Sequence, residues 1–431
     1  MEFRASSIGL VYKLLLVLGY ILPILAMPTF LTHKQVHRFS MKKINKFAVS
    51  NTDNSFETYN YTQVLDHFSY SPQAYQTFPQ RYMMDRTNWG GAQNNSPIFV
   101  CLGAEEDITY ELDMGIMTDQ APKFKALLVF IEHRYYGTSM PFGGIEAAYA
   151  NSTTLGHFTS TQALADYATV IIALKKELNA QNCPVIVFGA SYGGMLASWF
   201  RLKYPHVTIG ALASSAPILY FDDITPSYGY GSVVTKDFKN ASEICYKRIN
   251  ESWDMMDKIA SAPQGLSNLS ILFNTCQNLS SKDGLYDWIT VQYMIAAQYN
   301  FQEVEGICEA INGLPEGVDT VSRIAAAVKY IQGPSCLDLN ESDSTYPGWD
   351  WQICTEMVIP IGFPAEKTMF PASPFDIKEY ARECYLKYGV LPRPHWATTE
   401  FGGHEIRRVL KDFGSNIIFS NGLRDPYSSG G

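Results

Sequence analysis

One short segment constrains this chain more than any other. The apolar run Pro184 to Gly189 (PVIVFG) leads directly into Gly189-Ala190-Ser191-Tyr192-Gly193, and a helical pattern follows from Met195 to Tyr204. A G-x-S-x-G motif between a buried strand and a helix is the pattern of a nucleophile elbow, in which small flanking residues permit a strained turn. The alternative is an ordinary glycine-rich turn. The context favours Ser191 as a nucleophile held above the end of a strand.

Further apolar runs indicate that this strand belongs to a parallel sheet. Each run is bounded by Gly, Pro or polar residues, as expected for strands buried on both faces. A helical stripe of Leu164, Ala168, Ile171, Leu174 and Leu178 separates two of them, which predicts a right-handed βαβ unit with a cap at Ser160 or Thr161. The predicted strands are 97–102, 126–132, 184–189 and 208–213.

The hydrophobic pattern of the sequence changes after about residue 221. Strand-like apolar runs are replaced by helical segments such as 241–260 and 284–299. A strand-like run occurs again only at 416–420 (NIIFS). At 431 residues the chain exceeds one ordinary domain, so an insertion within a large fold is expected. The predicted organisation is a signal-peptide region at 1–32, a propeptide or arm at 33–56, a core at 57–221, a helical cap insertion at 222–398, and the rest of the core at 399–431.

The amino-terminus and the glycosylation motifs indicate the secretory pathway. Arg4 and Lys13 precede an apolar run at 14–26, which is too short to span a bilayer and resembles a signal peptide. Eight Asn-x-Ser/Thr motifs agree with secretion. The predicted glycosylation sites are Asn60, Asn94, Asn151, Asn240, Asn250, Asn268, Asn278 and Asn340. A net charge of −9 gives no field that would attract nucleic acid.

The cysteines agree with an oxidising compartment. Six of the eight lie in one stretch, Cys245, Cys276, Cys308, Cys336, Cys354 and Cys384, without the spacing of a zinc site, so disulfides are the better interpretation. Cys101 and Cys183 lie in apolar runs and are expected to be small buried residues.

A serine nucleophile needs backbone donors for the oxyanion of its tetrahedral intermediate. One predicted donor is the N–H of Tyr192 at the helix start. The second is expected from the loop after the first predicted parallel strand, at 103–107, where Gly103 permits close approach. For Glu105 and Glu106 in that loop, a role near the substrate and a solvated helix start remain open.

The chemistry also needs an acid and a base. In folds with a nucleophile elbow between a parallel strand and a helix, the acid follows the serine along the chain. Asp425 lies in a loop directly after the returning strand 416–420. An aspartate before proline is often only a turn former, but this position favours a catalytic carboxylate.

Several motifs together resemble the lysosomal Pro-X carboxypeptidase family, which includes dipeptidyl peptidase 2 and thymus-specific serine protease. They are the elbow and the segments 65–68 (LDHF), 132–137 (EHRYYG), 162–166 (QALAD), 204–206 (YPH), 214–217 (SSAP) and 420–426 (SNGLRDP). Variants such as LGAEE at 102–106 suggest a plant-type branch.

The resemblance implies an α/β-hydrolase core with a mostly parallel sheet, a helical cap with disulfides, Ser191 as nucleophile and Asp425 as triad acid. It also implies the pairs Cys245–Cys308, Cys276–Cys336 and Cys354–Cys384. A further family bridge would fall at Ser227 and near Gly362, neither of which is a cysteine. A proline pocket would involve Met195, Tyr427 and Ile359, with Met195 as a plain core residue the alternative.

The resemblance fails at the general base. Family members place a histidine after the acid, and none of the eight histidines here follows Asp425. His133 and His206 are interpreted as structural, and His395 and His404 would need an unusual topology. The expectation is therefore a carboxy-terminally truncated form, or a naturally short and inactive one.

The predicted function is a serine exopeptidase that cleaves peptides next to proline, with Pro-Xaa carboxypeptidase action as the first choice. The alternatives are an Xaa-Pro dipeptidyl peptidase, an inactive binding protein, and an esterase on the same fold. Expected partners are peptides with proline near a terminus, in a lysosome, vacuole or extracellular space; neither a cofactor nor a metal is expected, and a homodimer is left open.

Overall fold

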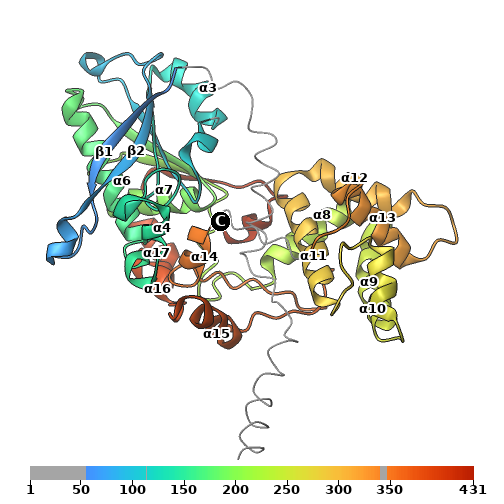
Figure 1. The fold of residues 1–431 in the computed structure, drawn as a ribbon. Coiled ribbons are helices and arrows are strands. Elements are labelled where there is room, and N and C mark those ends of the chain that lie inside the picture. The colour runs from blue at the N-terminus through green and yellow to red at the C-terminus, as the bar shows by residue number, and fades with distance from the viewer. Residues whose placement is uncertain (1–54, 113, 340–346) are drawn as a thin grey trace, which may run out of the picture.

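The structure is a computed structural model that describes residues 55–431 except 113 and 340–346 (Figure 1). The predicted signal-peptide region, nearly all of the predicted arm and the glycosylation motif at Asn340 lie outside the described residues.

A seven-stranded sheet forms the centre of the core, with the strand order β1-β2-β4-β3-β5-β6-β7. The pairs β1–β2 and β2–β4 are antiparallel, and all pairs from β4 to β7 are parallel. All the predicted strands are present, with ends shifted by at most two residues. The strands are β1 (Glu57–Val64), β2 (Thr77–Asp85), β3 (Ile98–Leu102), β4 (Leu127–Ile131), β5 (Val185–Ala190), β6 (Gly210–Ser214) and β7 (Ile417–Ser420).

Helices cover the sheet, and α6 shows why the sequence forms them. Its apolar stripe is buried as predicted, and its first turn is capped by the side chain of Thr159, which accepts a hydrogen bond from the Gln162 N–H. The expected cap at Ser160 or Thr161 is therefore wrong by one or two residues. The helices of this region are α3 (Gly115–Phe124), α4 (Ile145–Ala148), α5 (Ser152–Leu155), α6 (Ser160–Glu177) and α7 (Tyr192–Lys203).

The chain between β6 and β7 is helical, as predicted. Its helices are α8 (Gly229–Ala241), α9 (Glu243–Ala260), α10 (Gly265–Leu272), α11 (Asp283–Tyr299), α12 (Phe301–Asn312), α13 (Thr320–Gln332), α14 (Pro347–Ile353), α15 (Ile377–Tyr388), α16 (Trp396–Phe401) and α17 (Ile406–Asp412). Short 3-10 helices complete the described chain: η2 (Pro72–Tyr75), η3 (Ala92–Asn94), η4 (Ile108–Glu111), η5 (Pro141–Gly143), η6 (Gly403–Glu405) and η7 (Pro426–Gly430).

This helical region has two parts. Helices α8 to α13 gather on one side of the molecule, whereas α14 to α17 lie beside the core (Figure 1). The rings of Trp199 in α7 and Phe401 in α16 stack with their centroids 3.9 Å apart. Helix α16 therefore packs against the core close to residue 398, the end predicted for the insertion.

Three disulfides close the helical region and confirm the pairing that the family resemblance implied. They join Cys245 to Cys308, Cys276 to Cys336, and Cys354 to Cys384. Cys101 and Cys183 are free and buried, as expected.

The two positions of the absent family bridge lie side by side. The Gly362 N–H donates to the Ser227 carbonyl at 3.0 Å. A Cβ atom at Gly362 would come within 2.6 Å of the Phe375 nitrogen, so this position has no room for a cysteine side chain. A backbone hydrogen bond joins the two segments here.

A buried ion pair ties the core together. Arg134, directly after β4, bonds both carboxylate oxygens of Asp166 in α6, at 2.7 and 2.6 Å, and both side chains are fully buried. Its remaining N–H groups donate to the carbonyls of Val64, Leu65 and His157. All five guanidinium donors are thus used, which offsets the cost of burying the charge.

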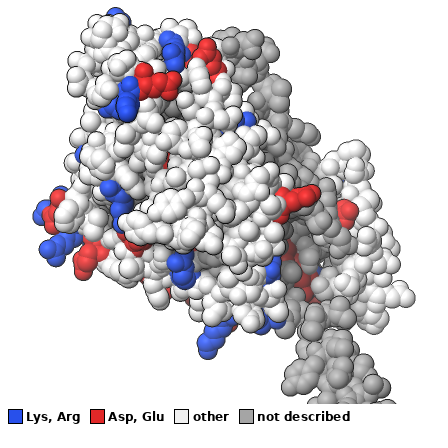
Figure 2. Space-filling view, turned by 60° about the vertical axis from the view of Figure 1, so that its left-hand side comes forward, with Lys and Arg blue, Asp and Glu red and all other residues white. Residues whose placement is uncertain are grey.

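The surface carries no single-sign field on the face shown in Figure 2, where acidic and basic side chains are interspersed among uncharged ones. Each of the seven predicted glycosylation asparagines in the described chain is exposed. Among the described helices, none has the length and hydropathy needed to cross a membrane.

Candidate active site

Ser191 lies in the turn between β5 and α7, where the sequence predicted an elbow. Its backbone has φ 55° and ψ −126°, a conformation that non-glycine residues rarely adopt and that costs on the order of 1–3 kcal/mol. The Ser191 N–H donates to the Ser214 carbonyl at 3.0 Å, and its carbonyl accepts from the Met195 N–H at 3.1 Å. The serine therefore joins the strand to the helix, is half-buried, and carries the strain expected of an elbow.

Neighbouring glycines make this turn sterically feasible. A Cβ atom at Gly194 would lie 2.7 Å from the Ser214 carbonyl oxygen, and one at Gly189 would overlap the Gly193 backbone. Real Cβ atoms do not approach so closely, so the backbone of α7 packs against β5 and β6 only because side chains are absent here. The role predicted for the small flanking residues agrees with this packing.

Asp425 lies at the same edge of the sheet as Ser191. Ser214 ends β6 and accepts from the Ser191 N–H, and the next residue, Ser215, hydrogen-bonds through its side chain to Asp425. Asp425 also caps η7, since its Oδ1 accepts from the Tyr427 N–H at 2.9 Å. Burial raises the pKa of Asp425, and these two hydrogen bonds oppose the rise. The predicted nucleophile and acid thus follow β5 and β7, two parallel strands that lie on either side of β6 in the sheet.

The backbone N–H groups of the two predicted oxyanion donors differ in whether they already have a hydrogen-bond partner within the fold. Tyr192 is the first residue of α7, where backbone N–H groups have no partner within the helix, so its N–H stays a predicted oxyanion donor. The Gly103 N–H instead donates to the Ile131 carbonyl at 2.9 Å, as part of the sheet. The Ala104 N–H donates to Glu111 at 2.7 Å. This use of the Gly103 N–H within the sheet argues against its predicted role as a donor.

The acidic loop after β3 is enclosed and not a solvated helix start. Glu105 is only 6% exposed. Its charge helps to raise the pKa of Tyr192 and opposes the fall in the pKa of His133, which places Glu105 beside the elbow. The helix cap in this loop is Asp107, whose side chain accepts from the Thr109 N–H. Burial and the charges of Glu111 and Glu105 raise the pKa of Glu106 well above its usual value.

The three residues predicted to form a proline pocket belong to the hydrophobic core. Met195 is 1% exposed, Tyr427 3% and Ile359 4%, and all three lie in one buried cluster. The Tyr427 ring packs against Tyr230, with 5.0 Å between the centroids. Protein atoms enclose these side chains next to the acid loop, which favours the core alternative for Met195.

Five of the six histidines in the described chain contact a polar group through a ring nitrogen, whereas the exposed His206 lies 6.1 Å from the ring of Tyr204, between centroids. His133 bonds the Tyr192 hydroxyl and the Arg134 carbonyl, which agrees with its predicted structural role. The others pair as follows: His67 with Asp166, His157 with Asp66, His206 with the ring of Tyr204, His395 with Asp222, and His404 with Thr399. That the base histidine is missing from this chain stays a prediction.

These features define a serine hydrolase with the α/β-hydrolase fold: a serine on a strained strand-to-helix turn, an aspartate after a later parallel strand, and this order of strands in the sheet. Residues 63–431 match the family described as Serine carboxypeptidase S28. The chain belongs to this family of serine-type carboxypeptidases, which confirms the family resemblance found in the sequence.

Similar proteins agree with this assignment. Lysosomal Pro-X carboxypeptidase of Mus musculus is 37% identical over 396 residues, which cover 86% of this chain and 78% of that protein. The Homo sapiens protein of the same name is 35% identical over 403 residues, 86% of this chain and 77% of its own length. Prolyl carboxy peptidase like protein 5 of Caenorhabditis elegans is 31% identical over 398 residues, 82% of this chain and 76% of that protein.

Sequence reasoning missed one residue that contacts the elbow and one that contacts the predicted acid. Gln352 donates to the Tyr192 hydroxyl at 2.8 Å from 160 positions away along the chain, and Ser215 bonds Asp425. Ser215 lies within a motif quoted above, but no local pattern indicates what its side chain contacts. Gln352 is two residues before Cys354, and the cysteine was the only local signal.

Buried carboxyl groups predict a pH dependence of stability. Burial raises the pKa of Glu356 to about 7, from 4.5 in the unfolded chain, and acts in the same direction on Glu111. The folded state therefore holds more protons between these values, and the free energy of unfolding falls as the pH rises from about 4.5 to 7. His133 opposes this, because burial lowers its pKa from 6.5 to about 4. The pKa values of Glu106 and Asp425 are raised as well, so the buried carboxyls outweigh the one imidazole, and urea denaturation should show higher stability at pH 5 than at pH 7.5.

The variant Glu356→Gln should make this profile less steep, because it removes one contribution on the order of 3 kcal/mol while Glu111 and Glu106 remain. Glu316→Gln, at an exposed position, is the comparison variant, and it should leave the slope unchanged. Higher stability at pH 7.5 than at pH 5 in the unmodified chain would contradict the assignment of neutral buried carboxyls.

Proposed function

We propose that this protein hydrolyses peptide bonds next to proline as a Pro-Xaa carboxypeptidase, through an acyl-enzyme on Ser191. The observation that carries the proposal is the strained elbow at Ser191, joined to Asp425 through Ser214 and Ser215, in a chain of the serine carboxypeptidase S28 family. The proline preference rests on relatives named Pro-X carboxypeptidase.

The proposed reaction has two steps. In the first, Ser191 Oγ attacks the carbonyl carbon of the scissile bond while an imidazole takes its proton. Asp425 orients this imidazole, and the Tyr192 N–H stabilises the oxyanion. The C–N bond then breaks, the imidazole returns the proton to the leaving amine, and the acyl group stays on Ser191. In the second step, water attacks the ester by the same route and frees the acid.

We assign the base to none of the eight histidines of this chain. Of the six that the structure describes, five contact other groups through a ring nitrogen and His206 follows the end of α7 opposite to Ser191; His33 and His37 lie outside the described residues. The proposed mechanism therefore needs an imidazole from elsewhere, and without it acylation should be roughly a thousandfold or more slower than with a complete triad.

The proposed location is the secretory pathway with a lysosomal, vacuolar or extracellular destination. Three disulfides, seven exposed glycosylation motifs and relatives named lysosomal support it.

Imidazole rescue tests the proposal. The purified chain is given peptides ending in Pro-Xaa, matched peptides ending in Ala-Xaa, and peptides beginning with Xaa-Pro, each over a range of imidazole concentrations. We expect release of the last residue from the Pro-Xaa peptides, at a rate that rises with imidazole. Release faster from Ala-Xaa than from Pro-Xaa peptides would contradict the proline preference. Release of Xaa-Pro dipeptides instead would show the opposite terminus to be the substrate.

The labelling of Ser191 provides the second measurement. A fluorophosphonate should attach to Ser191, detected by mass spectrometry of the peptide that contains it, at a rate that also rises with imidazole. Full labelling and turnover without imidazole would show that the chain supplies its own base. No labelling at any imidazole concentration would refute acyl-enzyme formation on this chain.

A further inference from the structure

The side chain of Tyr192, the residue after the nucleophile, is anchored deep in the protein. It is 1% exposed, and its ring packs against Trp349 and His133 with centroid distances of 5.3 and 5.6 Å. The backbone N–H of the same residue is the proposed oxyanion donor. Displacing this anchored side chain would therefore strain the backbone that carries the amide.

The hydrogen bonds around the Tyr192 hydroxyl have one consistent direction. His133 Nδ1 lies 2.6 Å from the Arg134 carbonyl, which can only accept, so Nδ1 carries the proton. His133 Nε2 must then accept from the Tyr192 hydroxyl, 3.1 Å away. The lowered pKa of His133, about 4 because of its burial, keeps the imidazole neutral in this arrangement at pH 5 and above.

Gln352 completes the chain of hydrogen bonds. Its Nε2 donates to the Tyr192 oxygen at 2.8 Å, and its Oε1 accepts from the Tyr136 hydroxyl at 2.6 Å. The amide therefore has one orientation that satisfies both neighbours. Gln352 is fully buried and comes from the helical region after β6, as does Glu356, with which its side chain also forms a hydrogen bond.

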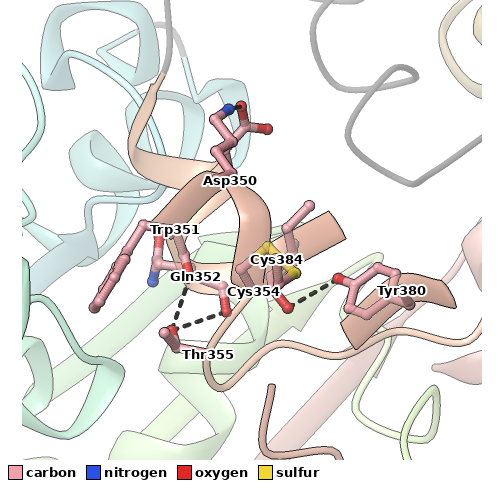
Figure 3. Close-up of a disulfide and its surroundings, with 9 residues drawn as sticks. Asp350, Trp351, Gln352, Cys354, Thr355, Tyr380 and Cys384 are labelled. Atoms are coloured by element: carbon pink, nitrogen blue, oxygen red, sulfur yellow. Dashed lines mark hydrogen bonds and ion pairs between the residues drawn. A yellow bond between two sulfur atoms is a disulfide. The ribbon is translucent and has the colours of Figure 1, made fainter. Parts of the chain in front are cut away.

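The backbone around Gln352 is fixed by several contacts (Figure 3). Gln352 lies on α14, and the Cys354–Cys384 disulfide joins the residue after this helix to α15. The Tyr380 hydroxyl of α15 donates to the Ile353 carbonyl at 2.8 Å, and Lys387 pairs with Asp350 at 2.6 Å. Two helices thus hold the segment that delivers the amide to Tyr192.

We propose that Gln352 is a positioning residue for the oxyanion site, because it fixes Tyr192 and through it the N–H that stabilises negative charge during acylation. This inference rests on the proposed function at Ser191. An oxyanion donor must lie within about 2.7–3.1 Å of the developing charge, and a misplacement of about 1 Å can cost a hundredfold in rate. Gln352 itself need not contact the substrate.

Leucine and glutamate replacements of Gln352 test the proposal. Gln352→Leu removes the donor to Tyr192 with little change in volume, and Gln352→Glu replaces the donating amide by a second acceptor. Tyr192→Phe removes the hydroxyl from the other side of the same hydrogen bond. Gln181→Leu, at an exposed glutamine before β5, is the matched control.

The first measurement is the rate of fluorophosphonate labelling of Ser191 in the presence of imidazole. Gln352→Leu and Tyr192→Phe should each slow labelling by roughly 10–100-fold, and the double variant should be no slower than the slower single variant, because both break one interaction. On Pro-Xaa peptides kcat should fall while KM stays within about twofold. Gln181→Leu should match the unmodified chain. Unchanged labelling in Gln352→Leu, or losses that multiply in the double variant, would refute the positioning role.

The second measurement does not depend on activity. Hydrogen exchange of the peptide covering 189–196 should become at least about tenfold faster in Gln352→Leu, while peptides of α6 should be unchanged. If the unmodified chain cannot be labelled, the proposed function at Ser191 fails, and hydrogen exchange alone decides whether Gln352 holds the elbow. Equal exchange in both proteins would overturn the inference.

Discussion

Replacement of Ser191 by alanine is expected to abolish fluorophosphonate labelling and imidazole-dependent cleavage of Pro-Xaa peptides. The loss should be at least about a thousandfold, because no covalent intermediate can form without the hydroxyl. The fold should not suffer, since the backbone hydrogen bonds at this position involve the Ser191 N–H and carbonyl and are kept by alanine. The thermal midpoint should stay the same or rise.

Ser198→Ala is the matched control for this experiment. Ser198 lies two turns further along α7, is fully buried, and uses its hydroxyl only to donate to the Met195 carbonyl at 2.8 Å. Labelling should persist in this variant. If Ser191→Ala retained labelling at the same rate, the nucleophile would be a different residue, and the interpretation of the elbow would be wrong.

The largest effect on stability is expected from Arg134→Met. This change removes five hydrogen bonds and leaves the Asp166 carboxylate buried without its main partner. Breaking one side of a buried ion pair costs about 3–5 kcal/mol. A urea denaturation curve should therefore show a much lower midpoint, unless the variant fails to fold during expression, which would agree with the same prediction.

Two further variants test whether the loss of the buried ion pair causes the lower midpoint. Arg134→Met with Asp166→Leu should recover part of the loss, because no charge is then left buried alone. Arg408→Met breaks an exposed pair with Asp412 on α17 and should leave the midpoint unchanged. Equal midpoints for Arg134→Met and Arg408→Met would show that the buried pair adds no stability.

The parts that could be predicted from the sequence are those encoded locally. A strand, a glycine-rich turn and a helix around Ser191 follow from residues within twenty positions of one another, so their conformation depends on nearby sterics. The place of Asp425 followed from the rule that parallel strands end at one edge. The disulfide pairs came only from family resemblance, because six cysteines alone allow 15 pairings.

The parts that could not be predicted depend on contacts between distant segments. Gly103 has the right residue type and position for an oxyanion donor, but β4 takes its N–H. Met195 has an apolar side chain that would suit a pocket or a core equally well, and only packing decides between them. Gln352 donates to Tyr192 from a distant part of the chain, and no repeating pattern in the sequence indicates a hydrogen bond between such distant segments.

The pairing of β6 with β7 has a consequence for biosynthesis. Ser214 and Ser420 are register partners, yet some two hundred residues and three disulfides separate them along the chain. The emerging polypeptide can form the sheet through β6 early, whereas its last parallel pairing must wait until the intervening helices have been made. Asp425 follows β7, so this carboxylate reaches Ser215 at the end of assembly, and a nascent chain arrested in the helical region would contain the serine without its acid.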